Sequence, residues 1–162
     1  EYIYPYKNNL TVASVEDCSH LLKKFKIKKI LKLDPNKKYP IKDNEYDLAT
    51  SWATLEHVGN INDQKQFLNE VSRVSKKFFL TTPYKYFPYE LHTGLFFLHW
   101  LPGKFFRKIL KIMSKDFWAN EKYLHLLSVS DVKKIIPKNK DIKVKLFYSF
   151  GFLPTHIIIY KK

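Results

Sequence analysis

Short apolar runs and longer stretches with helical spacing alternate along the first half of this chain. Runs with the length and composition of strands occur at Leu10–Val15, Lys28–Leu33, Tyr46–Ser51 and Lys77–Thr82. Within residues 63–75, between the last two runs, a helix face is indicated by the spacing of Phe67, Leu68, Val71 and Val74. A strand, a helix and a strand in so short a stretch predict a βαβ unit with parallel strands.

The pattern changes after Pro83, where aromatic residues become frequent. Short helices or partly helical pieces are expected at Leu91–Leu98, Gly103–Met113 and Phe117–Leu127. A further short helix begins near Ser130 and stops before Pro137, because proline cannot continue a helix. Two closing strands are expected at Asp141–Phe150 and His156–Tyr160.

Four ordered motifs carry a resemblance to a known family. They are Tyr46-Asp47-Leu48, Leu55-Glu56-His57-Val58, Phe67-Leu68-Asn69-Glu70-Val71-Ser72-Arg73-Val74 and Leu80-Thr81-Thr82-Pro83. These motifs resemble the second half of class I S-adenosylmethionine-dependent methyltransferases, and most of all the small-molecule type built around a Leu-Glu-His-Val turn. The resemblance implies an α/β fold with a Rossmann-like, mostly parallel sheet that ends in an antiparallel strand pair.

The same resemblance implies an activity and a domain plan. It implies S-adenosylmethionine as cofactor and methyl transfer to an oxygen, nitrogen or carbon atom of a small or lipid-like acceptor. Residues 1–162 would then form a single methyltransferase-like domain, with residues 84–127 as a helical lid insertion over the substrate.

One part of the family pattern does not occur in the sequence. The family opens with a strand and a Gly-rich turn that wraps the methionine part of the cofactor, where the backbone must approach the ligand closely. The four glycines of the chain are isolated: Gly59, Gly94, Gly103 and Gly151. We therefore expect a domain that is incomplete at its N-terminus, lacks the first strand and its turn, and is inactive as this segment alone.

Ligands of open parallel sheets bind at the carboxyl ends of the strands, which selects the cofactor candidates. By resemblance, Glu16 or Asp17 accepts hydrogen bonds from the ribose hydroxyls, although either could instead favour the start of the next helix. Asp34 would accept from the adenine amino group, with a turn-forming role before Pro35 as the alternative. Ser51 and Trp52 would lie beside the cofactor.

Three histidines are the candidates for chemistry on the acceptor. His57 could hold the substrate or act as a general base, because imidazole titrates near neutrality, or it could stabilise its turn together with Glu56. His92 and His99 follow in the aromatic segment, where Glu90 and Trp100 are candidate substrate contacts. The alternative is a hydrophobic helix pair with its polar edge exposed. No metal-ligand spacing of Cys or His appears, so no metal site is predicted.

The charged residues and the single cysteine indicate which partners and which cellular compartment to expect. The net charge is +14, but only two of the 29 basic residues are arginine, so we expect a generic basic surface rather than a nucleic-acid reader. Cys18 is the single cysteine, which excludes an intrachain disulfide and favours a reducing, cytoplasmic setting.

Two other functions stay open. One is a non-catalytic methyltransferase-like module that binds a partner through its aromatic face. The other is a basic protein of membrane surfaces that dips Leu95–Leu98 and Trp100 into the interface.

Overall fold

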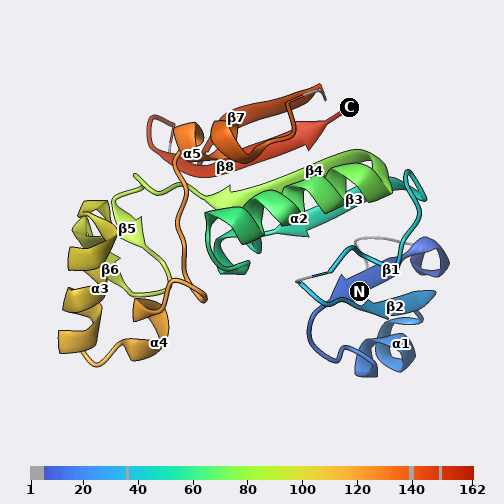
Figure 1. Ribbon diagram of the computed structural model, residues 1–162, viewed down its shortest axis with the longest axis horizontal. Helices are drawn as coiled ribbons and strands as arrows, with labels where there is room; N and C mark the ends of the chain where they lie inside the picture. The colour runs from blue at the N-terminus through green and yellow to red at the C-terminus, as the bar shows by residue number, and fades with distance from the viewer. Residues whose placement is uncertain (1–5, 36, 139–140, 150) are drawn as a thin grey trace. The chain divides into compact units, whose positions relative to one another are not determined.

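The computed structural model describes residues 6–35, 37–138, 141–149 and 151–162. The chain divides into two compact units, Glu1–Pro40 and Ile41–Lys162 (Figure 1). The expectation that residues 1–162 form a single domain with a lid stays a prediction.

The first unit contains one parallel strand pair joined by a helix. Its elements are η1 (Lys7–Asn9), β1 (Thr11–Ser14), α1 (His20–Phe25) and β2 (Lys29–Lys32). β1 and β2 pair in parallel, with Val12 opposite Ile30. Both strands lie within the runs predicted from the sequence, and their carboxyl ends lead to the acidic candidates Asp17 and Asp34.

The second unit is organised around a four-stranded sheet in the order β3-β4-β8-β7. Its strands are β3 (Tyr46–Trp52), β4 (Ser75–Pro83), β7 (Ile142–Tyr148) and β8 (Pro154–Lys161). β3 and β4 are parallel with Ser51 opposite Leu80, which confirms the predicted βαβ unit. β8 is antiparallel to both β4 and β7, which confirms the closing antiparallel pair. The predicted end of the first closing strand, Phe150, lies outside the described residues.

Helix α2 (Ile61–Val74) connects the two parallel strands and starts with a capping box. The Asn60 side chain accepts hydrogen bonds from the backbone amides of Asn62 and Asp63, while the Asp63 carboxylate accepts from the Asn60 amide. Gly59 precedes the cap with φ of +99°, and a Cβ there would lie 2.5 Å from Asp63 Oδ2. Glycine is required at this position because a larger residue would break the cap that starts the helix.

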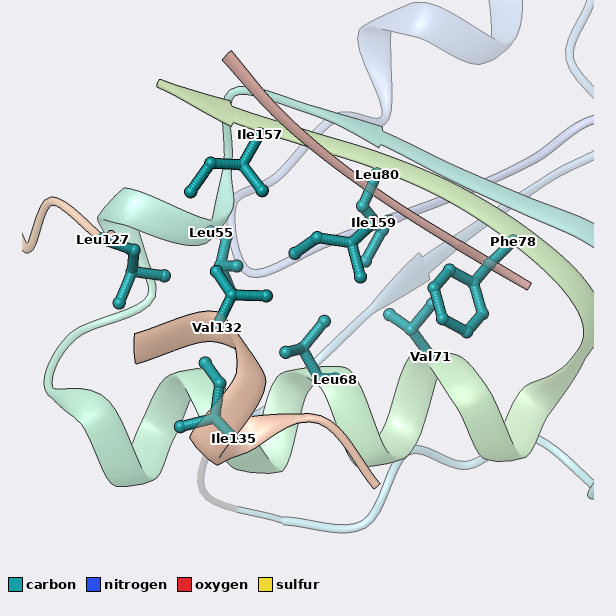
Figure 2. Close-up of a cluster of buried hydrophobic side chains, with 10 residues drawn as sticks. All are labelled: Leu55, Leu68, Val71, Phe78, Leu80, Leu127, Val132, Ile135, Ile157 and Ile159. Atoms are coloured by element: carbon teal, nitrogen blue, oxygen red, sulfur yellow. The ribbon is translucent and has the colours of Figure 1, made fainter. Parts of the chain in front are cut away.

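The main core lies between this sheet and the helices α2 and α5 (Val129–Ile135). Figure 2 shows Leu68 and Val71 of α2 pointing toward Phe78, Leu80 and Ile159 on the strands. The spacing of apolar residues that predicted the helix is therefore the spacing that buries them.

Residues 84–127 form a mixture of short elements. They are β5 (Tyr89–Glu90), β6 (Leu95–Phe96), η3 (Leu98–Trp100), α3 (Gly103–Ile112) and α4 (Asp116–Ala119). α3 confirms the predicted second helix, and a small core joins it to α4 through Phe106, Leu110 and Ala119.

The helix predicted over Leu91–Leu98 is wrong. The Glu90 carboxylate accepts from the backbone amides of His92 and Thr93 and closes a turn, and Gly94 continues with φ of +71°. β5 and β6 then pair in antiparallel fashion around that turn. A local side-chain-to-backbone contact replaces the helix here.

None of the helices in the described ranges is long and apolar enough to cross a membrane.

Replacing Leu68 with alanine should destabilise the second unit by about 2–5 kcal/mol, because the side chain is only 1% exposed and its loss leaves a cavity. All three tryptophans lie in this unit, so tryptophan fluorescence during urea unfolding reports on it alone. Lys65→Ala on the exposed face of α2 is the control and should change stability by less than about 0.5 kcal/mol. Equal effects of the two substitutions would contradict the assigned core.

Candidate functional site

The turn after β3 is the short helix η2 (Leu55–His57). Hydrogen bonds to the backbone of residues 123–125 hold it in place. Gln64 Nε2 donates to the carbonyl oxygens of Leu55 (2.9 Å) and His125 (3.0 Å), and the His125 amide donates to the Glu56 carbonyl (2.8 Å). His57 Nδ1 lies 2.6 Å from the Tyr123 carbonyl oxygen. These contacts fix the two ionisable residues of the turn in position.

Glu56 is the most deeply buried acid of this site, with no exposed surface. Its Oε2 accepts a hydrogen bond from Thr82 Oγ1 at 2.9 Å, near the end of β4. Its Oε1 has no hydrogen-bond partner among the described residues and lies 3.8 Å from His57 Nε2. A buried carboxylate oxygen without a donor is costly unless positive charge faces it.

A second acid, Glu90, holds His92. Glu90 Oε1 accepts from His92 Nδ1 (2.7 Å) and from the His92 amide (3.1 Å), and Oε2 accepts from the Thr93 amide (2.6 Å). Burial opposes ionisation of Glu90, but the hydrogen bonds from His92 and Thr93 lower its pKa to about 2. The hydrogen bond to Glu90 in turn raises the pKa of His92.

The two histidines meet although they come from distant parts of the chain. The rings of His57 and His92 are 4.7 Å apart, edge to face, and the ring of Trp118 lies 5.1 Å from His92 and 6.0 Å from His57. Glu56, His57 and His92 each offer one ligand atom, and these atoms lie within 4.8 Å of one another. The structure therefore brings together the candidates His57, His92 and Glu90 at the carboxyl end of the parallel pair.

Three residues that contact or belong to this cluster were not among the site candidates predicted from the sequence. Glu56 was assigned mainly to the turn, while Thr82 and Trp118 were not singled out. The Leu-Glu-His-Val motif contained a signal for Glu56, but nothing in the sequence indicated that its carboxylate is fully buried.

His99 and Trp100 lie in a different environment. His99 is buried, its Nε2 donates to the Phe87 carbonyl at 2.8 Å, and its ring contacts Phe106. Burial lowers the pKa of His99. Trp100 is 42% exposed and packs edge to face on Phe97.

A cavity of about 300 Å³ lies next to these residues. Its lining is mostly apolar and includes Pro83, Phe87, Leu91 and Leu126, with Glu90 and His99 among its few ionisable groups. Glu90 thus faces the cavity and also holds His92. A small apolar molecule fits this combination of lining and size.

The acidic cofactor candidates lie at strand ends of the first unit. The Glu16 amide donates to Ser14 Oγ (3.0 Å), while the Glu16 side chain is exposed. The Asp17 carboxylate accepts from the Ser19 amide at 2.9 Å, and hydrogen bonds from Ser19 lower its pKa. Asp34 forms an exposed ion pair with Lys37 at 3.1 Å.

The remaining cofactor candidates end β3 in the second unit. Ser51 is half-buried opposite Leu80, and Trp52 is 66% exposed and packs on the Phe79 ring at 5.3 Å. Cofactor binding by these five residues stays a prediction.

His99 should make the stability of the protein depend on pH. Because its pKa is lower in the folded than in the unfolded chain, the unfolded chain binds the proton first, and stability falls as the pH drops below about 6.5. The free energy of unfolding of the native protein and of His99→Gln, measured between pH 8 and 5, should diverge below pH 6.5 by at most about 1.4 kcal/mol per pH unit. Parallel curves would contradict this environment for His99.

Comparison with known proteins supports the resemblance to methyltransferases. Residues 5–78 match the family described as a methyltransferase domain, a span that includes the Leu-Glu-His-Val turn. No curated protein matches the chain.

Several solved structures share the fold at low sequence identity. An S-adenosylmethionine-dependent methyltransferase from Methanosarcina mazei is 14% identical, with a TM-score of 0.52 over 94% of this chain and 81% of that one. A putative Zn-dependent alcohol dehydrogenase from Rhodobacter sphaeroides is 8% identical, with a TM-score of 0.58 over 94% and 75%. A possible exported protein from Bordetella parapertussis is 10% identical, with a TM-score of 0.53 over 94% and 62%.

The family implies S-adenosylmethionine as cofactor, and the chain offers part of what that cofactor needs. Carboxylates follow the carboxyl ends of β1 and β2 and can accept from hydroxyl and amino groups. No Gly-rich turn for the methionine part occurs within residues 1–162. The match over residues 5–78 to the methyltransferase domain family and the fold shared with solved structures support the resemblance to class I S-adenosylmethionine-dependent methyltransferases.

Proposed function

We propose that this protein transfers a methyl group from S-adenosylmethionine to a small or lipid-like acceptor. The observation that carries the proposal is the meeting of His57 and His92 beside the buried Glu56, at the carboxyl end of a parallel strand pair. Ligands of open α/β sheets bind at this end. The neighbouring apolar cavity supports an acceptor with an apolar body.

Five residues would hold the cofactor. In the first unit, Asp17 or Glu16 would accept from the ribose hydroxyls and Asp34 from the adenine amino group, and Ser51 and Trp52 are the candidates of the second unit. When bound, S-adenosylmethionine supplies a methyl group activated by its sulfonium. Since residues 1–162 contain no Gly-rich turn, we expect weak binding of the methionine part and no turnover from this segment alone.

The acceptor would be positioned by the histidine cluster. His57 and His92 are each fixed through Nδ1, to the Tyr123 carbonyl and to Glu90, so each presents Nε2 as its free ring atom. These atoms can hold the attacking group of the acceptor or take its proton. His99 and Glu90 would contact the acceptor from the cavity side, and Trp100 stays a predicted substrate contact outside the cavity lining. Positioning of this kind is the main requirement of methyl transfer.

The amino-acid composition supports a proposal for the cellular compartment and for the class of partner. One cysteine in 162 residues favours a reducing, cytoplasmic compartment, and the scarcity of arginine disfavours nucleic acid as the partner.

Asp34→Ala should weaken S-adenosylmethionine binding by about 1–3 kcal/mol, because the cofactor would lose a charged acceptor. Asp47→Ala is the matched control, since Asp47 is also an exposed acid paired with a lysine, Lys76 at 2.8 Å. Calorimetric titration with the cofactor compares the two. Equal affinities for native protein and Asp34→Ala would return Asp34 to the role of a turn residue.

A second candidate function is contact with a membrane surface, which a group of exposed side chains favours. Phe96, Phe97 and Phe105 are 61%, 51% and 63% exposed, and Trp100 and Leu101 are also exposed nearby in sequence. Helix α3 carries Lys104, Lys108 and Lys111. Aromatic residues among lysines suit an interface with anionic lipid, and a lipid-like acceptor would be found there.

The native protein should float with vesicles that contain phosphatidylserine, whereas a Phe97→Ser, Phe105→Ser double variant should stay in the soluble fraction. Phe152→Ser is the control, because Phe152 is 81% exposed and lies far along the chain from this group. Flotation that is the same for native protein and double variant, or absent for both, would refute the membrane role.

A further inference from the structure

We propose that Glu56, His57 and His92 form a binding site for a divalent transition-metal ion. The three residues come from the turn after β3 and from the turn after β5, and their ligand atoms lie within 4.8 Å of one another. This inference goes beyond methyl transfer, and it does not depend on the cofactor.

The Glu56 carboxylate offers a free ligand atom that is already desolvated. The side chain is fully buried, and Thr82 satisfies only Oε2. Oε1 has no hydrogen-bond donor among the described residues. Since burial of an uncompensated carboxylate is costly, a cation beside Oε1 would remove the penalty.

His57 is held in the tautomer that a metal ion requires. A carbonyl oxygen can only accept, so the 2.6 Å contact with Tyr123 places the proton of the neutral ring on Nδ1. Nε2 then carries a lone pair, and it lies 3.8 Å from the free Glu56 Oε1. An ion between these atoms would have one nitrogen and one oxygen ligand.

His92 is oriented in the way that metal-binding histidines usually are. Its Nδ1 donates to the Glu90 carboxylate, which leaves Nε2 available. A carboxylate behind a ligating histidine fixes the ring and makes its nitrogen a better ligand. Glu90 is itself held by two backbone amides, so this support is rigid.

The ligand atoms of Glu56, His57 and His92 lie slightly farther apart than the ligands of a bound ion would. Ligands at bond lengths of about 2.0–2.2 Å around a tetrahedral ion lie roughly 3.3–3.6 Å apart, so closure would need inward shifts of roughly 1 Å or less. The Trp118 ring lies 5.1 Å from the His92 ring and 6.0 Å from the His57 ring, so it packs against both ligands.

The donor set selects the kind of ion. Two imidazoles and one carboxylate favour Zn²⁺, Co²⁺ or Mn²⁺ over Mg²⁺ and Ca²⁺, which prefer oxygen ligands alone. Three protein ligands leave coordination positions open. An acceptor hydroxyl bound there would lose its proton more readily. With an ion bound, Nε2 of each histidine is a ligand and no longer a base.

Titration of the metal-free chain with Co²⁺ tests the site without any methyl donor. Calorimetry and the visible absorption of Co²⁺ should show one saturable site per chain with nitrogen and oxygen ligands. Cys18→Ser should be used as the background, because Cys18 and His20 are close in sequence and could bind Co²⁺ independently.

Four variants in this background decide the assignment. Glu56→Gln and His92→Gln should weaken Co²⁺ binding at least tenfold, and Glu90→Gln, which removes only the support of His92, should weaken it roughly 10–100-fold. His20→Gln is the matched control and should bind Co²⁺ as the background does. Circular dichroism checks that each variant is folded, and His92→Gln, at a half-buried position, remains decisive if Glu56→Gln unfolds.

Failure of the background protein to show saturable Co²⁺ binding would overturn the proposal. Equal affinities for the background, His92→Gln and Glu90→Gln would overturn it as well. Because the readout is metal binding alone, either result would leave the proposed methyl transfer untouched.

Discussion

The buried Glu56 carboxylate is the constraint around which the second unit is built. Its burial results from the η2 turn, which Gln64 and the backbone of residues 123–125 hold against the core. One oxygen is satisfied by Thr82 at the end of the neighbouring strand, and the other has no donor among the described residues. An arrangement this costly persists when the surrounding structure fixes it and a positive charge compensates it.

The fold and the site are linked through the carboxyl ends of two strands. The parallel pairing of β3 with β4 brings the Leu-Glu-His-Val turn to the edge where Thr82 and Pro83 end their strand. The chain then continues into the Glu90 turn, whose hydrogen bonds orient His92 toward His57. The pairing of the two parallel strands therefore positions the Leu-Glu-His-Val turn and the Glu90 turn, and these two turns position the histidine pair.

Much of the fold could be predicted because it depends on local periodicity and proline positions. The βαβ unit, α3, α5 and the closing strands follow from such patterns. The turn at Glu90 could not, since a carboxylate there binds its own backbone and overrides the apolar spacing of Leu91–Leu98.

The candidate site was predicted in part for the same reason. His57 and His92 were recognisable as residue types, but their contact depends on tertiary structure. The burial of Glu56 depends on Thr82 and on residues 123–125, which are remote in sequence. Local sequence patterns carry no information on which distant residues come into contact. The ligand set of Glu56, His57 and His92 was therefore not predicted.

The central claim is that Glu56, His57 and His92 act as one ligand set. X-ray absorption spectroscopy of the Co²⁺-loaded protein tests it most directly, because the method reports the atoms bound to the metal. We expect two imidazole nitrogens and a carboxylate oxygen at about 2.0–2.2 Å from the metal. A sulfur ligand near about 2.3 Å, or a shell of water oxygens alone, would contradict it.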